Sequence, residues 1–208
     1  ESLDAVDLEL LQETIRGLLA GKEMPLPHYN FHTGCREWRG DTLRIDPHDL
    51  LIMEGIHGLN PKVIEGFARD EVFRVYVNAL THLNLDPHTR IPTRDYRLIR
   101  RMVRDHQFRG YSAQQTLKGW KHVREGEDRY IYPYQEEADF IFNTSMVYEM
   151  LILKKTAVEL LEAIAPDEET YVEAQRLLSL LQYFDSADSA HIPSHSILAE
   201  FVGNSVFF

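Results

Sequence analysis

The chain has 208 residues, of which 44% are hydrophobic and 26% charged, and its formal net charge is −11. This composition is typical of a globular domain. The longest apolar runs of the chain are far shorter than the ~20 residues that a membrane-spanning helix needs. The chain has a single cysteine, Cys35, which excludes an intrachain disulfide. The short apolar runs and the single cysteine lead us to expect a cytoplasmic protein without a membrane partner. The excess of acids over bases, 33 against 22, argues against a general nucleic-acid surface.

The chain opens with a helical pattern. Apolar residues recur at spacings of three and four over Leu3–Leu19, which predicts an amphipathic helix with Ser2 as its N-cap and Gly21 as its stop. The segment Met24–Gly40 contains two prolines and several aromatic residues that break this period. We therefore expect a long loop or a hairpin there.

Short apolar runs predict three strands, at Leu50–Met53, Val72–Val77 and Phe140–Phe142. Helical patterns occupy the gaps and the region beyond, at residues 60–67, 93–108, 112–125, 147–163 and 170–184. Strands separated by helices favour crossover connections, and so a parallel sheet with helices on both faces, in the α/β class. The apolar stretch at 192–208 is expected to pack back on the domain.

Basic residues gather in one helical segment. Six of the 22 lie between positions 94 and 109, namely Arg94, Arg97, Arg100, Arg101, Arg104 and Arg109. Positions 97, 101 and 104 share a helical face that can clamp phosphates, which suits a small polyanion such as a nucleotide. From periodicity alone, a solvated helix that pairs with the protein's own acids explains the pattern equally well.

Three motifs carry a resemblance to a known family. They are Leu50–Ile56 with the sequence LLIMEGI, Arg97–Asp105 with RLIRRMVRD, and Gln107–Gly110 with QFRG. In order and spacing they resemble the uridine kinase and phosphoribulokinase family of nucleotide-dependent kinases. The resemblance covers roughly residues 1–161, and the ending at 196–203 looks like the tail of bacterial uridine kinase-related proteins.

The resemblance implies a parallel sheet of the P-loop NTPase type with flanking helices. No G-x-x-x-x-G-K-[ST] phosphate loop occurs in the chain, so the first strand, this loop and the family's catalytic aspartate are expected upstream of it. Residues 1–165 would form the C-terminal part of the kinase domain, with a lid at about 93–125, and residues 166–208 a helical extension packed on it. Without the phosphate loop, the isolated chain is expected to be inactive. Because its sheet would lack a central strand, the isolated chain is also expected to be unstable or a homo-oligomer.

The family pattern also implies site residues. Glu54 matches the metal-associated acid that supports Mg²⁺, although a lone acid after an apolar run is, by itself, more typical of a structural hydrogen bond to a neighbouring loop. Arg104 and Arg109 match lid arginines that bind the ATP phosphates and neutralise charge during transfer. Arg101 matches an arginine near the acceptor.

The acceptor side is matched near the N-terminus. Asp4, in the motif Asp-Ala-Val-Asp, matches an acid that binds sugar hydroxyls, and Tyr29 and Phe31 match aromatic rings that wall the acceptor pocket. Without the resemblance, acids at a helix start favour its dipole, and aromatic side chains in a long segment often form its packing core.

Three departures leave the acceptor open. Gly34, Tyr111 and Gly119 stand where pyrimidine nucleoside kinases place a histidine, an arginine and a glutamine directed at the acceptor. The loss of these groups removes the basis for base specificity.

The resemblance as a whole implies an ATP- and Mg²⁺-dependent kinase that phosphorylates a hydroxyl of a nucleoside or similar small molecule. The alternatives are a non-catalytic nucleotide- or metabolite-binding module of a larger protein, and a kinase with a sugar-phosphate or vitamin acceptor.

Overall fold

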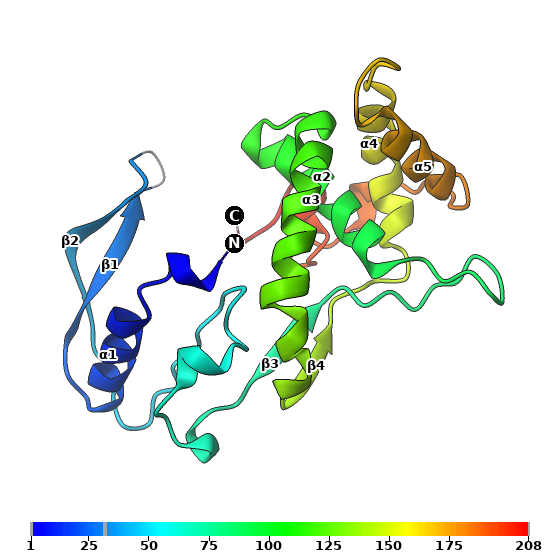
Figure 1. Cartoon of the computed structure of the whole chain (residues 1–208). Helices are drawn as coiled ribbons and strands as arrows, with labels where there is room; N and C mark the ends of the chain where they lie inside the picture. The colour runs from blue at the N-terminus through cyan, green and yellow to red at the C-terminus, as the bar shows by residue number, and fades with distance from the viewer. Residues whose placement is uncertain (1, 31–32, 208) are drawn as a thin grey trace. The chain divides into compact units, whose positions relative to one another are not determined.

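The computed structural model describes residues 2–30 and 33–207 of the chain (Figure 1). The chain divides into two compact units. The first comprises residues 1–76 and 126–140, and the second comprises residues 77–125 and 141–208. Each unit is described by itself.

The first unit is built from a helix and a hairpin. Helix α1 (Leu8–Leu19) begins after Asp7, whose side chain accepts a hydrogen bond from the Leu10 N–H at 3.1 Å. This cap explains why the predicted helix starts later than Leu3, since the preceding residues form only a short 3-10 turn at Leu3–Ala5. Strands β1 (Met24–Asn30) and β2 (Cys35–Leu43) pair antiparallel, which confirms the hairpin alternative.

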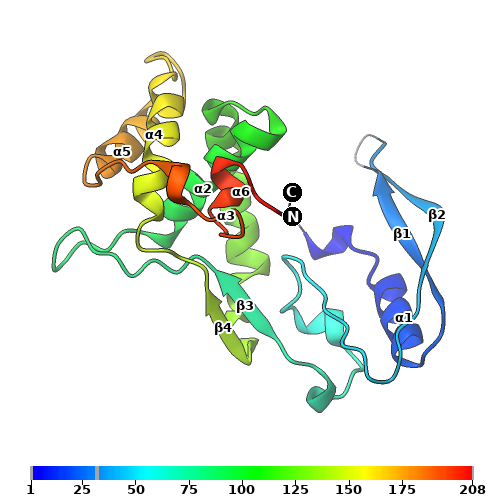
Figure 2. The same cartoon turned by 180° about the vertical axis from the view of Figure 1, so that it is seen from behind.

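The second unit has a helical core. Its helices are α2 (Thr93–Arg109), α4 (Glu149–Glu162), α5 (Tyr171–Leu181) and the short α6 (Ala199–Val202). Their fully buried side chains include Tyr96, Met102, Met150, Leu153 and Leu177, and Leu198, the residue before α6, is also fully buried. The four predicted helices from 93 to 184 are confirmed, and α6 lies against α2 (Figure 2).

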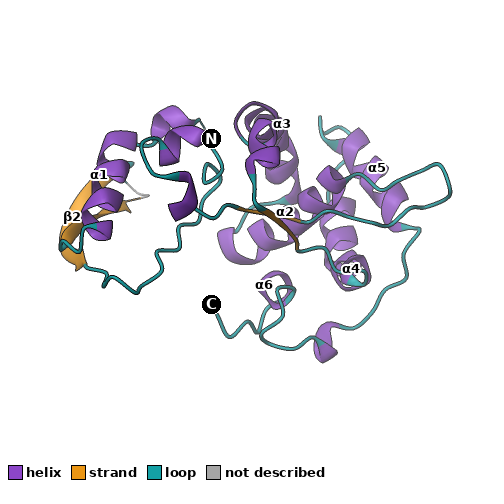
Figure 3. Cartoon of the chain, turned by 90° about the horizontal axis from the view of Figure 1, so that it is seen from below, coloured by secondary structure: helices purple, strands orange, loops and turns teal. Residues whose placement is uncertain are grey.

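Helix α3 (Ala113–Tyr130) extends further than the predicted 112–125. It starts with the expected capping box. The Ser112 N–H donates to Gln115 Oε1 at 2.8 Å, and the Gln115 N–H donates to Ser112 Oγ at 3.2 Å. The buried α3 side chains Leu117, Trp120 and Val123 join the core of the second unit, and helices make up most of that unit when it is seen from below (Figure 3).

The parallel strands are β3 (Val75–Asn78) and β4 (Phe140–Asn143). The Phe140 N–H donates to the Arg74 carbonyl at 3.2 Å, and the Thr144 N–H donates to the Asn78 carbonyl at 2.8 Å. Both partners advance in the same direction, so the pair is parallel. Helices α2 and α3 fill the crossover between these strands. The predicted α/β class with parallel strands and flanking helices is confirmed.

The predicted strand at Leu50–Met53 is wrong. In the described part of the chain this segment is irregular and pairs with no strand. Leu50 and Ile52 are 83% and 81% exposed. An apolar run becomes a strand only where a neighbouring strand can bond its backbone, and here no described strand does so.

The predicted helix at 60–67 is reduced to a 3-10 turn, Pro61–Ile64, capped by Asn60. Gly66, with a φ of +85°, adopts a left-handed conformation that cannot continue a right-handed helix. Within the described residues, no helix combines the length and apolar character needed to cross a membrane.

Candidate functional site

The second unit holds two of the predicted site arginines on a single carboxylate: Arg109, predicted to bind phosphate, and Arg101, predicted to lie near the acceptor. Arg101 Nε lies 3.3 Å from Asp105 Oδ2, and Arg109 Nη1 donates to Asp105 Oδ1 at 2.9 Å. Asp105 is 1% exposed, whereas the side chains of Arg101 and Arg109 are 30% and 49% exposed. The three residues are spaced four apart on α2, so both guanidinium groups converge on one point of the helix surface.

Arg104 faces a different partner. Its Nη1 lies 3.6 Å from Glu200 Oε1 on α6, and its Nε is buried with no hydrogen-bond partner among the described residues. The Gln107 side-chain amide, on the same helix, donates to the Phe201 carbonyl at 2.6 Å and accepts from the Gly203 N–H at 3.1 Å. The C-terminal segment therefore covers the face of α2 that carries Arg104.

A buried ion pair supports this face from one turn earlier. Arg100 donates from Nε to Glu149 Oε1 at 2.8 Å, and a second bond from Nη2 reaches Glu149 Oε2. The same guanidinium bonds the Thr144 carbonyl at 2.8 Å and lies 5.5 Å from the Phe201 ring centre. Glu149 also accepts from the Met146 N–H at 2.9 Å, so the pair joins α2, α4 and the end of β4.

The predicted metal-associated acid lies in the first unit. Glu54 is exposed and belongs to the irregular segment after Leu50. The turn that follows it is held by His57, whose ring meets the Tyr130 ring edge-on at 6.2 Å between centroids. Among the described residues no group of three His, Cys, Asp or Glu side chains is placed to hold a metal ion. Glu54 can therefore offer one carboxylate but not a complete protein site.

The predicted acceptor residues also lie in the first unit. Asp4 is exposed, and its Oδ2 accepts from Ser2 Oγ at 2.8 Å, as is typical of an acid at a helix start. Tyr29 is 54% exposed on β1, where it is paired in register with Arg36 of β2. Phe31, the other predicted pocket residue, lies outside the described residues.

Asp7 joins the hairpin to α1. The Leu10 N–H and, next, the Arg36 guanidinium at 2.7 Å hold the pKa of the Asp7 carboxyl below its usual value. Arg36 also lies 5.7 Å from the centre of the exposed Trp38 ring. The predicted acceptor acid Asp4 is thus placed next to a capped and charge-paired helix start.

The two sets of predicted residues therefore belong to different units. Arg101 and Arg109 are brought together, and Arg104 lies on the same helix with a separate partner. Pairing with the protein's own acids, which periodicity alone left open, is observed for all three arginines. Sequence reasoning missed the two acids. The spacing of Asp105, four residues from each arginine, was a usable signal, whereas Glu200 is too far along the chain for any spacing argument.

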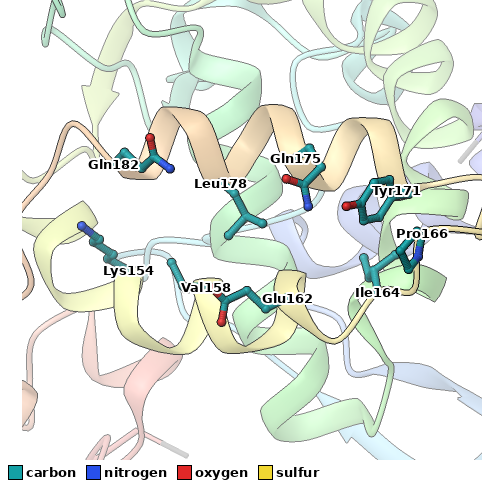
Figure 4. A pocket seen from close by; sticks show the side chains of 9 residues that line it. All are labelled: Lys154, Val158, Glu162, Ile164, Pro166, Tyr171, Gln175, Leu178 and Gln182. Carbon is teal, nitrogen blue, oxygen red and sulfur yellow. The ribbon is translucent and has the colours of Figure 1, made fainter.

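A groove of about 470 Å³ lies elsewhere in the second unit, between α4 and α5 (Figure 4). Lys154 and Glu162 contribute charged groups to its lining, and Val158 and Leu178 contribute apolar surface. Lys154 Nζ is bonded to the Phe184 carbonyl. None of the site residues predicted from the sequence lines this groove.

Comparisons with known proteins agree with the motifs. A family model described as "Phosphoribulokinase / Uridine kinase family" matches residues 1–150. Proteins named uridine kinase from Staphylococcus aureus strains JH9, Newman and MW2 are each 30% identical to the chain over 139 residues. The match covers 66% of this chain and 58% of each relative, so the chain spans somewhat more than half of the length of these curated relatives.

Proposed function

Because the chain belongs to the phosphoribulokinase and uridine kinase family, we propose that the protein is a kinase that transfers the terminal phosphoryl group of ATP to a hydroxyl of a nucleoside or similar small molecule. The observation that supports this best is the pair of arginines on Asp105, a local excess of positive charge in a protein with a net charge of −11. The S. aureus relatives, named uridine kinases, support the nucleoside class of acceptor.

The arginine pair fits the phosphate groups of ATP. Each guanidinium group has five N–H donors in a plane, and the contacts to Asp105 use only part of them. The remaining donors can bind phosphate oxygens in the bidentate geometry that arginine favours. Arg109 and Arg101 would then neutralise charge on the transferring group, a contribution that for a transfer arginine is commonly ~10³-fold or more in rate.

Magnesium fits the single exposed carboxylate of Glu54. Mg²⁺ at nucleotide sites is commonly held by one or two carboxylates together with phosphate oxygens and water, rather than by a complete protein cage. Glu54 would supply such a carboxylate or orient a bound water. When bound, the ion would neutralise charge on the phosphate oxygens.

The acceptor side is proposed to include Asp4 and Tyr29. Gly34, which replaces a family histidine, has a φ of +67° in the hairpin turn, a conformation that disfavours any residue with a side chain. Tyr111 is 48% exposed, and a side chain at Gly119 would project into open space. These three positions therefore disfavour an acceptor that is recognised through its base. We propose that the acceptor is recognised mainly through its hydroxyl groups.

The test is a kinase assay on the full-length protein encoded by the gene. Transfer from ATP would be measured against nucleosides, sugar phosphates and vitamins with a free hydroxyl. Arg109→Ala should lower kcat by at least about tenfold, since it removes a phosphate-binding group. Arg124→Ala, which removes an exposed charge from α3 in the same unit, is the matched control.

Three outcomes are distinguishable in this assay. Transfer to a nucleoside that depends on Arg109 and not on Arg124 supports the proposal. Transfer only to a sugar phosphate or a vitamin keeps the kinase and changes the acceptor class. Binding of ATP without transfer to any acceptor would contradict the proposal and support a non-catalytic nucleotide-binding module.

A further inference from the structure

We propose that Asp105 is a positioning residue, which holds Arg101 and Arg109 at a fixed separation so that together they bind a chain of phosphates. This inference rests on the proposed function, because it names a group that prepares the phosphate site. Asp105 would not contact the nucleotide itself. It would act through the two arginines.

The carboxylate is in a position to do this. It is 1% exposed, each of its oxygens faces a different arginine, and the two arginines are one helical turn away in opposite directions. Its backbone is fixed as well. The Asp105 carbonyl accepts from the Tyr111 N–H at 3.1 Å and from the N–H of Gly110, the left-handed residue that ends α2. The anchor is thus a rigid helix end.

The arginines keep donors for a ligand. Arg101 approaches Asp105 with Nε, which leaves both of its terminal nitrogens unused in that contact. Arg109 uses Nη1, which leaves Nη2 and Nε. Both side chains are exposed enough to meet a solute, at 30% and 49%. Two planar donor groups that share one anchor lose less side-chain entropy on binding than two free arginines would.

The balance of charge separates this cluster from ion pairs that hold the fold together. In the same unit, Arg100 pairs with Glu149 one to one, and Arg176 is shared by two carboxylates, Asp95 and Glu173. Asp105 does the reverse, with two arginines on one carboxylate and a surplus positive charge. A surplus charge half open to solvent is what an anion-binding group requires, whereas a neutral pair suffices for packing.

The experiment compares Asp105→Asn with Asp95→Asn in the full-length protein. Asp95 is also a nearly buried carboxylate of α2, bonded by both terminal nitrogens of Arg176 at 2.8 Å, so its removal disturbs the same helix without touching the arginine pair. Two quantities would be measured. They are kcat with ATP as the phosphoryl donor, and the Kd of inorganic tripolyphosphate by calorimetry without magnesium.

We expect Asp105→Asn to weaken tripolyphosphate binding and to lower kcat, each by about tenfold or more, because small misplacements of a site group cost that much or more. Asp95→Asn should lower the melting temperature and leave both quantities of the folded protein unchanged. In an Arg109→Ala background the Asp105→Asn change should have a much smaller effect, since residues that act as a unit are not additive. If Asp105→Asn does not fold, Asp105→Glu, which keeps the charge but moves the carboxylate outward, should show the same losses.

The outcomes separate the two proposals. Unchanged tripolyphosphate affinity and kcat in Asp105→Asn, or losses equal to those of Asp95→Asn, would overturn the positioning role. A wild-type protein that binds tripolyphosphate in an Asp105-dependent way but transfers no phosphate from ATP would support the positioning role and overturn the kinase. A wild-type protein that binds no tripolyphosphate would overturn the positioning role, whatever its activity.

Discussion

The buried ion pair between Arg100 and Glu149 predicts a large and specific loss of stability. Glu149 is fully buried, and the Arg100 side chain is 9% exposed. The substitution Glu149→Gln keeps the shape of the side chain but removes its charge. It leaves the Arg100 guanidinium without a counter-charge beside the Phe201 ring, while the Met146 N–H keeps an acceptor only if the amide oxygen turns toward it.

The expected cost follows from this burial. Removal of one partner of a buried ion pair typically destabilises by about 3–5 kcal/mol, because the remaining charge is buried and uncompensated. The matched control is Glu173→Gln. Glu173 pairs with Arg176, but these side chains are 42% and 47% exposed, and Arg176 keeps Asp95 as a partner. An exposed pair of this kind contributes less than about 1 kcal/mol.

Urea unfolding followed by tryptophan fluorescence measures the difference. The chain has two tryptophans. Trp120 is buried in the second unit, and Trp38 is 52% exposed on the hairpin of the first, so a Trp38→Phe background makes Trp120 the sole reporter. With an m-value of about 2 kcal/mol/M, a loss of about 3 kcal/mol lowers the midpoint by about 1.5 M. A midpoint for Glu149→Gln no lower than that of Glu173→Gln would refute the reasoning.

Two further predictions concern the ends of the chain. The folded-state pKa of Asp7 lies below its usual value of 3.8, so the contribution of its carboxylate to stability is present above that value and is lost as the pH falls through the folded pKa. Between about pH 5 and pH 2.5, Asp7→Asn should therefore lose less α1 helicity by circular dichroism than the wild type, and an equal loss would contradict this. Glu200→Gln should free Arg104 and lower the KM for ATP severalfold in the full-length protein. A KM that is unchanged or higher would show that the contact with α6 does not compete with the nucleotide.

Helices with a strong apolar period were predictable from the sequence. The segment from Thr93 onward places Tyr96, Ile99 and Met102 on one face, and the structure buries all three. The capping box at Ser112 was also predictable, because both of its bonds join residues three positions apart. These features depend on local spacing, which the sequence states directly.

Features that depend on distant partners were not predictable. The run Leu50–Met53 has the composition of a strand, but pairing requires a neighbour that composition does not identify. The same limit applied to the site. The arginines of α2 were found from the resemblance. The acid that pairs with Arg104 is Glu200, which lies 96 positions further along the sequence. Only Asp105 lay within reach of a spacing argument.

The docking of α6 has a consequence for the order in which the protein acquires its structure. Leu198 and Phe201 are buried in the core of the second unit, and Phe201 lies beside Arg100. On the ribosome, α2 and α3 emerge long before the segment that carries these side chains. Until that segment has been made, the nascent second unit keeps an open hydrophobic surface along α2, which is the kind of surface that chaperones bind. Completion of its core therefore waits until the segment with Leu198 and Phe201 has been synthesised, and a nascent chain arrested before Leu198 should stay sensitive to protease along α2.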